Sequence, residues 1–191
     1  MSDHPPNDRL PHRRLARDLG ALDQALYEAV TVTETPALDR ALRRLSAAAD
    51  HSKISVAVAG LLALVPGRPR RAALLGMAAV GVASASANLV GKKLVRRRRP
   101  HRAEDSPFPG RHVAMPDSAS FPSGHTASAV AFAAAVGPAL PVATVPLGLI
   151  AVAVGYSRVH TGVHYPGDVI AGALLGTGAA AVVLTAARAT H

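Results

Sequence analysis

The chain has no cysteine, and its aromatic residues make up only 3% of 191 residues. The absence of cysteine excludes disulfides, cysteine-ligated zinc sites and thiol catalysis. A water-soluble core usually depends on large side chains such as Leu, Ile and Phe, whereas much of the apolar content here is Ala and Val. Because small side chains let helix backbones approach closely, this composition favours tightly packed helices.

Charged residues are also scarce, at 17% of the chain, against about 25% in an average soluble domain. The charge that is present is unbalanced, because 21 Lys and Arg against 12 Asp and Glu give a net charge of +9. Such a balance fits a nucleic acid, an anionic membrane surface or a phosphorylated substrate. The first 20 residues contain no apolar run, so we expect no cleaved secretory signal.

Five mostly apolar runs without formal charge follow residue 53. A helix that spans a membrane needs about 20 residues, with a range of roughly 17–25. Two runs meet that length alone, and three need flanking Pro, Ser or His residues to complete a span. We therefore predict an all-α fold, an integral-membrane helical bundle of about five spanning helices; a soluble bundle of Ala-rich helices is the alternative. The runs cover residues 54–65, 72–90, 125–140, 142–156 and 169–187.

The N-terminal part of the chain has a different pattern. We expect residues 1–14 to form a disordered, polar tail. Residues 15–49 have leucines at helical spacing, charges on the other faces and a break at Pro36, which predicts N-terminal amphipathic helices. These helices either belong to a soluble layer or lie at a membrane interface, and the pattern leaves both readings open. Residues 50–191 then form the membrane-embedded domain.

The stretch from residue 92 to 100 reads K-K-L-V-R-R-R-R-P. If the preceding helix continues, Lys92 and Arg99 lie on one face with Asn88 and Arg96, about 10 Å apart. Both can then bind one anion, since Arg offers forked donors and Lys a point charge. Pro100 ends the helix or starts a loop. The other cations of the stretch are expected to meet lipid headgroups as a juxtamembrane anchor: Lys93, Arg97 and Arg98.

A second polar stretch, Phe121-Pro-Ser-Gly-His125, opens an apolar run. Ser123 suits a helix N-cap, and Gly124 lets the backbone approach a ligand closely. Free N–H groups at a helix N-terminus form an anion site. His125 would lie beside that anion, where it can give or take a proton. The alternative is an ordinary helix cap followed by a histidine without chemical function.

The third stretch runs from residue 157 to 168, at the start of the last apolar run. Pro166 suits the first turn of a helix, which places Asp168 in that turn and His164 just before it. Asp168 can accept a hydrogen bond from one ring nitrogen of His164, leaving the other free and basic. Arg158 supplies another phosphate donor. Metal binding by His160 and His164 is the alternative, but Gly and Pro interrupt the helix that this spacing needs.

Taken in order, these stretches resemble the signature of the type-2 phosphatidic acid phosphatase superfamily. That signature is K-x6-R-P, then P-S-G-H, then S-R-x5-H-x3-D, and every position of it is present here. The resemblance covers about residues 40–187. Bacterial members often have six spanning helices, so the five counted here are a departure from the family.

The resemblance implies a helical bundle with a histidine-based phosphomonoesterase site. His164 would attack phosphorus and form a phosphohistidine, and Asp168 would hold its tautomer. His125 would protonate the leaving oxygen and then activate water. No metal or other cofactor is needed for this chemistry. The residues implied to bind the substrate phosphate are Lys92, Arg99, Ser123, Gly124 and Arg158.

The implied function is a membrane-bound lipid phosphatase, with a phosphatidic acid or a polyprenyl phosphate or diphosphate as substrate and no nucleic-acid partner. The alternatives are a vanadate-dependent haloperoxidase-like enzyme, a soluble acid phosphatase of the same superfamily, and a non-enzymatic basic membrane anchor. If the apolar runs alternate across the membrane, 17 of the 21 Lys and Arg lie on the side of the three motifs. The positive-inside rule therefore predicts a multi-pass cell-membrane protein with a cytoplasmic active site. The sequence leaves the individual lipid and the oligomeric state open.

Overall fold

The computed structural model describes residues 11–102 and 108–190, and within them every regular element is a helix. The predicted all-α fold is therefore confirmed. In chain order the elements are α1 (Pro11–Val32), α2 (Pro36–Ala48), η1 (Asp50–Ser52), α3 (Lys53–Ala63), α4 (Arg68–Ala85), η2 (Ser86–Gly91), α5 (Lys92–Leu94), η3 (Pro109–Arg111), α6 (Gly124–Val136), η4 (Pro141–Ala143), α7 (Thr144–His160) and α8 (Pro166–Ala189).

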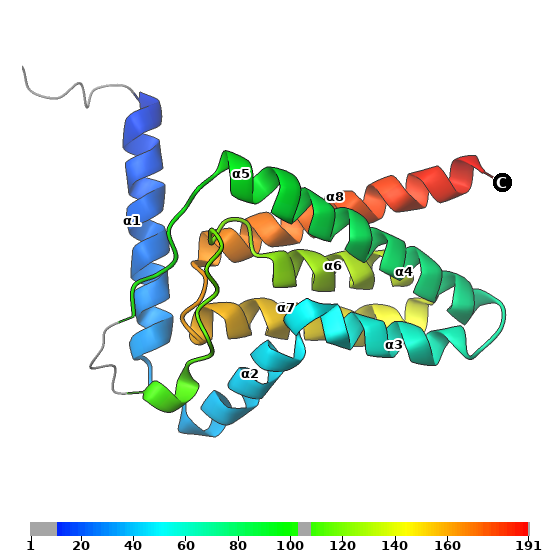
Figure 1. Ribbon diagram of the computed structural model, residues 1–191, viewed down its shortest axis with the longest axis horizontal. Coiled ribbons are helices and arrows are strands. Elements are labelled where there is room, and N and C mark those ends of the chain that lie inside the picture. Colours follow the sequence, from blue (N-terminus) through cyan, green and yellow to red (C-terminus); the bar gives the residue numbers. More distant parts are fainter. Residues whose placement is uncertain (1–10, 103–107, 191) are drawn as a thin grey trace, which may run out of the picture.

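Each of the five predicted apolar runs forms a helix, and Figure 1 shows these helices, α3, α4, α6, α7 and α8, extending along one common direction. Helix α6 contacts α4, α7 and α8, so it lies at the centre of the bundle. Three segments are long and apolar enough to cross a membrane: Arg68–Leu89, Pro141–His160 and Pro166–Ala189. Helices α3 and α6 are shorter, with 11 and 13 residues. They alone cover only part of a hydrocarbon core about 30 Å thick.

The outer faces of the long helices carry large apolar side chains. Leu74 on α4, Val152 on α7 and Leu174 on α8 are all exposed. Apolar surface repeated on every long helix fits a lipid surround better than water. This distribution favours the integral-membrane bundle over the soluble bundle of Ala-rich helices.

The contact between α6 and α8 is made of small residues. A Cβ atom at Gly172 or Gly176 of α8 would collide with the carbonyl oxygen of Ser123 or Ala127, respectively. The two helices therefore pack backbone against backbone, which explains why the chain needs so few aromatic side chains. The buried cluster that joins α4, α6 and α8 consists of Ala79, Ala83, Ala127, Ala131, Ala135, Ala179 and Ala180.

The two N-terminal helices lie at one end of the bundle, and α1 runs across that end rather than along the spanning helices (Figure 1). Helix α1 begins at Pro11, inside the stretch expected to be a tail, and α2 begins at Pro36, the predicted break. The buried side chain of Arg111 contacts both helices and holds them together. It forms an ion pair with Asp39 of α2 at 3.1 Å and donates to backbone carbonyls at the end of α1.

The helix through α4 does not continue to Arg99, so the condition for a shared face of Lys92 and Arg99 is not met. It passes through the π-helical η2 and ends with α5 at Leu94, after which the chain is not helical. There the backbone N–H of Ser120 donates to the carbonyl of Arg97 at 3.0 Å. In a continued helix, Lys92 and Arg96 would be like charges four positions apart, as would Lys93 and Arg97, which is destabilising. Pro100 also disfavours helical geometry in the residue before it.

Candidate active site

Four of the predicted site residues come from three helix ends that converge at the end of the bundle crossed by α1. Arg158 is in the last turn of α7, and His164 is in the loop that follows it. His125 and Asp168 are in the first turns of α6 and α8. Because α6 begins here, the backbone N–H groups of its first turn favour an anion at this position.

His164 and Asp168 form the predicted pair. The Nδ1 atom of His164 lies 3.4 Å from Oδ2 of Asp168, whose side chain is 0% exposed. The same Oδ2 accepts a hydrogen bond from the backbone N–H of Tyr165 at 3.0 Å. With its Nδ1 side turned to a fixed carboxylate, the ring presents Nε2 to the open side of the site.

The pKa of His164 is lowered by burial and by two arginines. Burial lowers the pKa of His164 to about 4, and the nearby Arg99 and Arg158 act in the same direction, against the opposing hydrogen bond with Asp168. The ring is therefore neutral at physiological pH, with a lone pair available for attack on an electrophile.

Arg99 is held directly beside the free nitrogen of that ring. Its Nη1 atom lies 3.3 Å from Nε2 of His164 and donates to the carbonyl of Val163 at 2.8 Å. Its Nε atom donates to the carbonyl of Ser118 at 2.9 Å. These backbone contacts fix a guanidinium group beside Nε2 of His164.

The second histidine, His125, has a carboxylate partner that the sequence analysis missed. Its Nε2 lies 2.8 Å from Oδ1 of Asp50, and the same oxygen lies 3.8 Å from Nη1 of Arg158. The Asp50 side chain is 43% exposed, so it stands at the mouth of the site rather than in the core. Each histidine of the site thus faces one aspartate.

The backbone next to Asp50 is unusual. His51 and Ser52 have φ values of 55° and 57°, a left-handed conformation that costs energy for residues other than glycine. Consecutive residues of this kind make a sharp turn between α2 and α3. This turn holds the Asp50 carboxylate against His125, and strained conformations of this sort are concentrated at functional sites.

Among the other predicted phosphate-binding residues, Arg158 and Ser123 are buried, and Gly124 lines a cavity. Arg158 is 2% exposed and donates to the hydroxyl of Ser46 at 2.7 Å, and its Nε has no hydrogen-bond partner within the described residues. Ser123 occupies the N-cap position of α6, but its hydroxyl accepts from Thr126 and does not cap the helix. Gly124 lies at the cavity wall, with open space where a Cβ would be.

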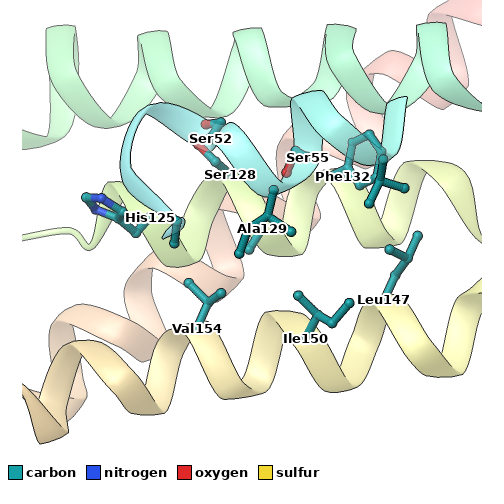
Figure 2. A pocket seen from close by; sticks show the side chains of 12 residues that line it. Ser52, Ser55, His125, Ser128, Ala129, Phe132, Leu147, Ile150 and Val154 are labelled. Carbon is teal, nitrogen blue, oxygen red and sulfur yellow. The ribbon is translucent and has the colours of Figure 1, made fainter. Parts of the chain in front are cut away.

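A cavity of about 170 Å³ lies beside the two histidines. It is lined by His164, His125, Arg99 and Gly124, so both histidines face one space. An apolar slot of about 20 Å³ shares His125 with this cavity. Figure 2 shows the slot leading from His125 between α3, α6 and α7, lined by Ala129, Phe132, Leu147, Ile150 and Val154.

Two predictions for the basic stretch need correction. Lys92 and Arg99 do not share a helix face, because the helix ends between them; the side chain of Lys92 lies outside the described residues. Arg97 is not a headgroup anchor. It forms ion pairs with Asp168 at 3.1 Å and with Asp23 of α1 at 2.6 Å, so it belongs to the site.

A sequence model of the PAP2 superfamily matches residues 72–190, which include all three motifs. The chain belongs to the PAP2 superfamily. It is 37% identical over 156 residues to the decaprenylphosphoryl-5-phosphoribose phosphatase of Mycobacterium tuberculosis, covering 80% of this chain and 82% of that protein. It is also 41% identical over 96 residues to the lipid A 1-phosphatase of Rhizobium etli, covering 47% of this chain and 39% of that protein.

Two solved structures share the fold. The transmembrane PAP2-type phosphatidylglycerolphosphate phosphatase of Bacillus subtilis has a TM-score of 0.72 at 23% identity, covering 91% of this chain and 88% of that one. LpxE of Aquifex aeolicus has a TM-score of 0.69 at 23% identity, covering 86% and 95%. Together with the family match, these findings make the protein a membrane phosphatase of the PAP2 superfamily.

Proposed function

We propose that this enzyme removes phosphate from a polyprenyl-type lipid through a phosphohistidine on His164. The observation that carries the proposal is the arrangement of that ring, with Nδ1 turned to the buried Asp168 and Nε2 beside Arg99 in a cavity shared with His125. A neutral imidazole held in one tautomer is a nucleophile. The relatives supply the substrate class, because the mycobacterial protein is named for a decaprenylphosphoryl compound.

In the first step, Nε2 of His164 forms a bond to phosphorus while the bond from phosphorus to the lipid oxygen breaks. His125 would act as the imidazolium, keeping its Nε2 proton on Asp50 and giving the proton of Nδ1 to that oxygen, so the lipid leaves as a neutral alcohol and the ring becomes neutral. Asp168 stabilises the positive ring of the phosphohistidine. His125 lines the same cavity as His164, which supports its role as the proton donor.

In the second step, His125 takes a proton from a water molecule, and the oxygen of that water attacks phosphorus. The bond between phosphorus and Nε2 of His164 breaks, inorganic phosphate is released and the ring becomes neutral again. Asp50 accepts a hydrogen bond from His125 at 2.8 Å. This bond would fix the orientation of the ring in both steps.

The phosphate oxygens would be held by Arg99, Arg158, Lys92, the N–H of Gly124 and the hydroxyl of Ser123. Phosphoryl transfer depends mainly on positioning and charge stabilisation, and these groups supply positive charge and a helix N-terminus. We therefore expect phosphate release to persist in EDTA.

The lipid chain would lie against the apolar outer faces of the spanning helices, where Leu74, Val152 and Leu174 are exposed, because the slot of Figure 2 has a volume of only about 20 Å³. The slot begins at His125, the residue that would protonate the lipid oxygen, and continues past Val154 and Ile150 to Leu147. Its walls also include Ser52, Ser55 and Ser128, and a space of this size holds about one water molecule. We propose that the active site faces the cytoplasm, since 17 of 21 Lys and Arg would lie on that side of the membrane.

The test is phosphate release from a panel of phosphatidic acid, polyprenyl phosphate and polyprenyl diphosphate by detergent-purified protein in EDTA, beside the His164→Ala variant. We expect the parent to prefer a polyprenyl substrate and the variant to lose release. Equal release by both proteins would remove His164 as the nucleophile. A parent that releases phosphate best from phosphatidic acid would contradict the proposed lipid class.

A further inference from the structure

Helix α1 has the features of a helix that lies on a membrane surface. Figure 1 shows it crossing the end of the spanning helices, an orientation that would place its axis in the plane of a membrane crossed by those helices. Its leucines, Leu15, Leu19, Leu22 and Leu26, recur at helical spacing and are all exposed. Arginines accompany them on its N-terminal half. Exposed leucines on one face with arginines elsewhere are typical of interfacial helices.

An open groove separates the apolar face of α1 from the start of α8. It has a volume of about 710 Å³, and Leu19, Leu22 and Leu26 form its α1 side. Phe121 and Ile170 are on the opposite side, and Ile170 is itself exposed on a spanning helix. The groove lies along a spanning helix and is lined mainly by apolar side chains, so the occupant that fits it is the acyl chains of bilayer lipid.

One acidic residue lies on this apolar face and ties α1 to the catalytic end of α8. Asp23 is four residues after Leu19, so both lie on one side of the helix. Its Oδ1 accepts a hydrogen bond from the backbone N–H of Gly167 at 2.7 Å, and its Oδ2 lies 2.6 Å from Nη2 of Arg97. Asp23 therefore contacts both the first turn of α8 and an arginine of the site.

Arg97 links Asp23 to the pair formed by His164 and Asp168. Its Nη1 lies 3.1 Å from Oδ1 of Asp168, and its guanidinium stacks on the ring of Tyr165 at 4.1 Å. The other oxygen of Asp168 faces Nδ1 of His164. A continuous series of polar contacts thus runs from α1 to the ring of His164.

We propose that α1 is a membrane-surface helix. When it binds lipid, it holds the Asp168 carboxylate in position through Asp23 and Arg97. The inference rests on the function proposed above. When the leucines of α1 are embedded in lipid, Asp23 holds Arg97 against Asp168, and Asp168 holds His164. When α1 leaves the lipid, Arg97 loses one of its two carboxylates, and Asp168 loses part of its support. Asp23 and Arg97 are positioning residues, not catalytic ones.

The first experiment measures kcat and KM for the water-soluble p-nitrophenyl phosphate with protein in phosphatidylcholine nanodiscs, so that substrate partition into lipid plays no part. Arg97→Gln should lower kcat about tenfold, the loss expected when one charged hydrogen bond is removed, with KM little changed. Asp23→Asn should lower kcat about threefold to tenfold, and Asp23→Glu should restore most of it. The matched control is Glu28→Gln, an exposed position on the same helix, which should behave as the parent.

The second experiment tests the role of lipid with the double variant Leu19→Ser/Leu22→Ser in the same nanodiscs. It should lower kcat as much as Asp23→Asn, and combining all three changes should cause no further loss, because the changes act through one pathway. Normal kcat in Asp23→Asn and Arg97→Gln, or additive losses in the triple variant, would overturn the inference. A parent that does not release more phosphate than His164→Ala would instead contradict the proposed function itself.

Discussion

Replacing Asp50 by Asn should impair the proton donor of the site while leaving the nucleophile intact. The variant removes the charge of the oxygen that lies 2.8 Å from Nε2 of His125. A hydrogen bond to a charged group contributes about 1.5–3 kcal/mol, and the lower end applies because Asp50 is 43% exposed and water replaces part of the contact. About 1.4 kcal/mol corresponds to a tenfold loss of rate.

The leaving group of the substrate reveals which step is affected. A lipid alkoxide needs a proton to leave, whereas p-nitrophenolate does not. For Asp50→Asn we expect kcat/KM to fall about tenfold with a short-chain alkyl phosphate and to change less than about twofold with p-nitrophenyl phosphate. His125→Ala should show the same selectivity with a larger loss, about 10²- to 10⁴-fold for the alkyl substrate.

The control for this experiment is Asp117→Asn, which changes an exposed aspartate in the loop beside the cavity and should leave both substrates unaffected. An equal loss with the two substrates in Asp50→Asn would refute the reasoning. It would mean that Asp50 acts through the charge of Arg158, which lies 3.8 Å away, and not through proton transfer by His125.

Three further predictions concern the nucleophile, the packing and the orientation. Because the pKa of His164 is lowered to about 4, the ring stays neutral as pH falls from 7 to 5. Diethyl pyrocarbonate, which reacts with neutral imidazole, should therefore inactivate the enzyme at a rate that declines only near pH 4, when the part of the inactivation that phosphate prevents is followed. A midpoint near pH 6.5 would contradict the lowered pKa. Gly176→Ala should lower the melting midpoint in detergent by several degrees, since overpacking costs about 1–3 kcal/mol, whereas Gly178→Ala, with open space around it, should not. In the cysteine-free chain, Asp117→Cys should react with an impermeant maleimide only after cells are permeabilised; labelling of intact cells would place the site outside.

The signature residues could be located from the sequence because their spacing is tied to helix ends. Pro166 starts α8, which places Asp168 in its first turn and His164 just before it, as predicted. The apolar runs likewise marked the five membrane-domain helices, since lipid exposure requires apolar side chains on outward faces as well as inward ones. Local rules of this kind need no knowledge of tertiary contacts.

The contacts of Asp50 and Arg97 could not be predicted in the same way. Asp50 meets a histidine 75 positions away, and Arg97 meets an aspartate 71 positions away. Arg97 is one of four successive arginines, so nothing in the sequence separates it from its neighbours. Asp23 did carry a signal, because a lone acid on the apolar face of an amphipathic helix must find a partner when that face is covered.

The most direct test of the histidine mechanism is to trap the covalent intermediate with an aryl [³²P]phosphate and rapid quenching. The parent enzyme should carry an acid-labile, base-stable label on His164, and His164→Ala should carry none. His125→Ala should accumulate more label than the parent, because aryl phosphate bypasses the first proton transfer while the water-activating group is missing. Label that persists in His164→Ala, or an active parent that never forms a phosphohistidine, would contradict the proposed nucleophile.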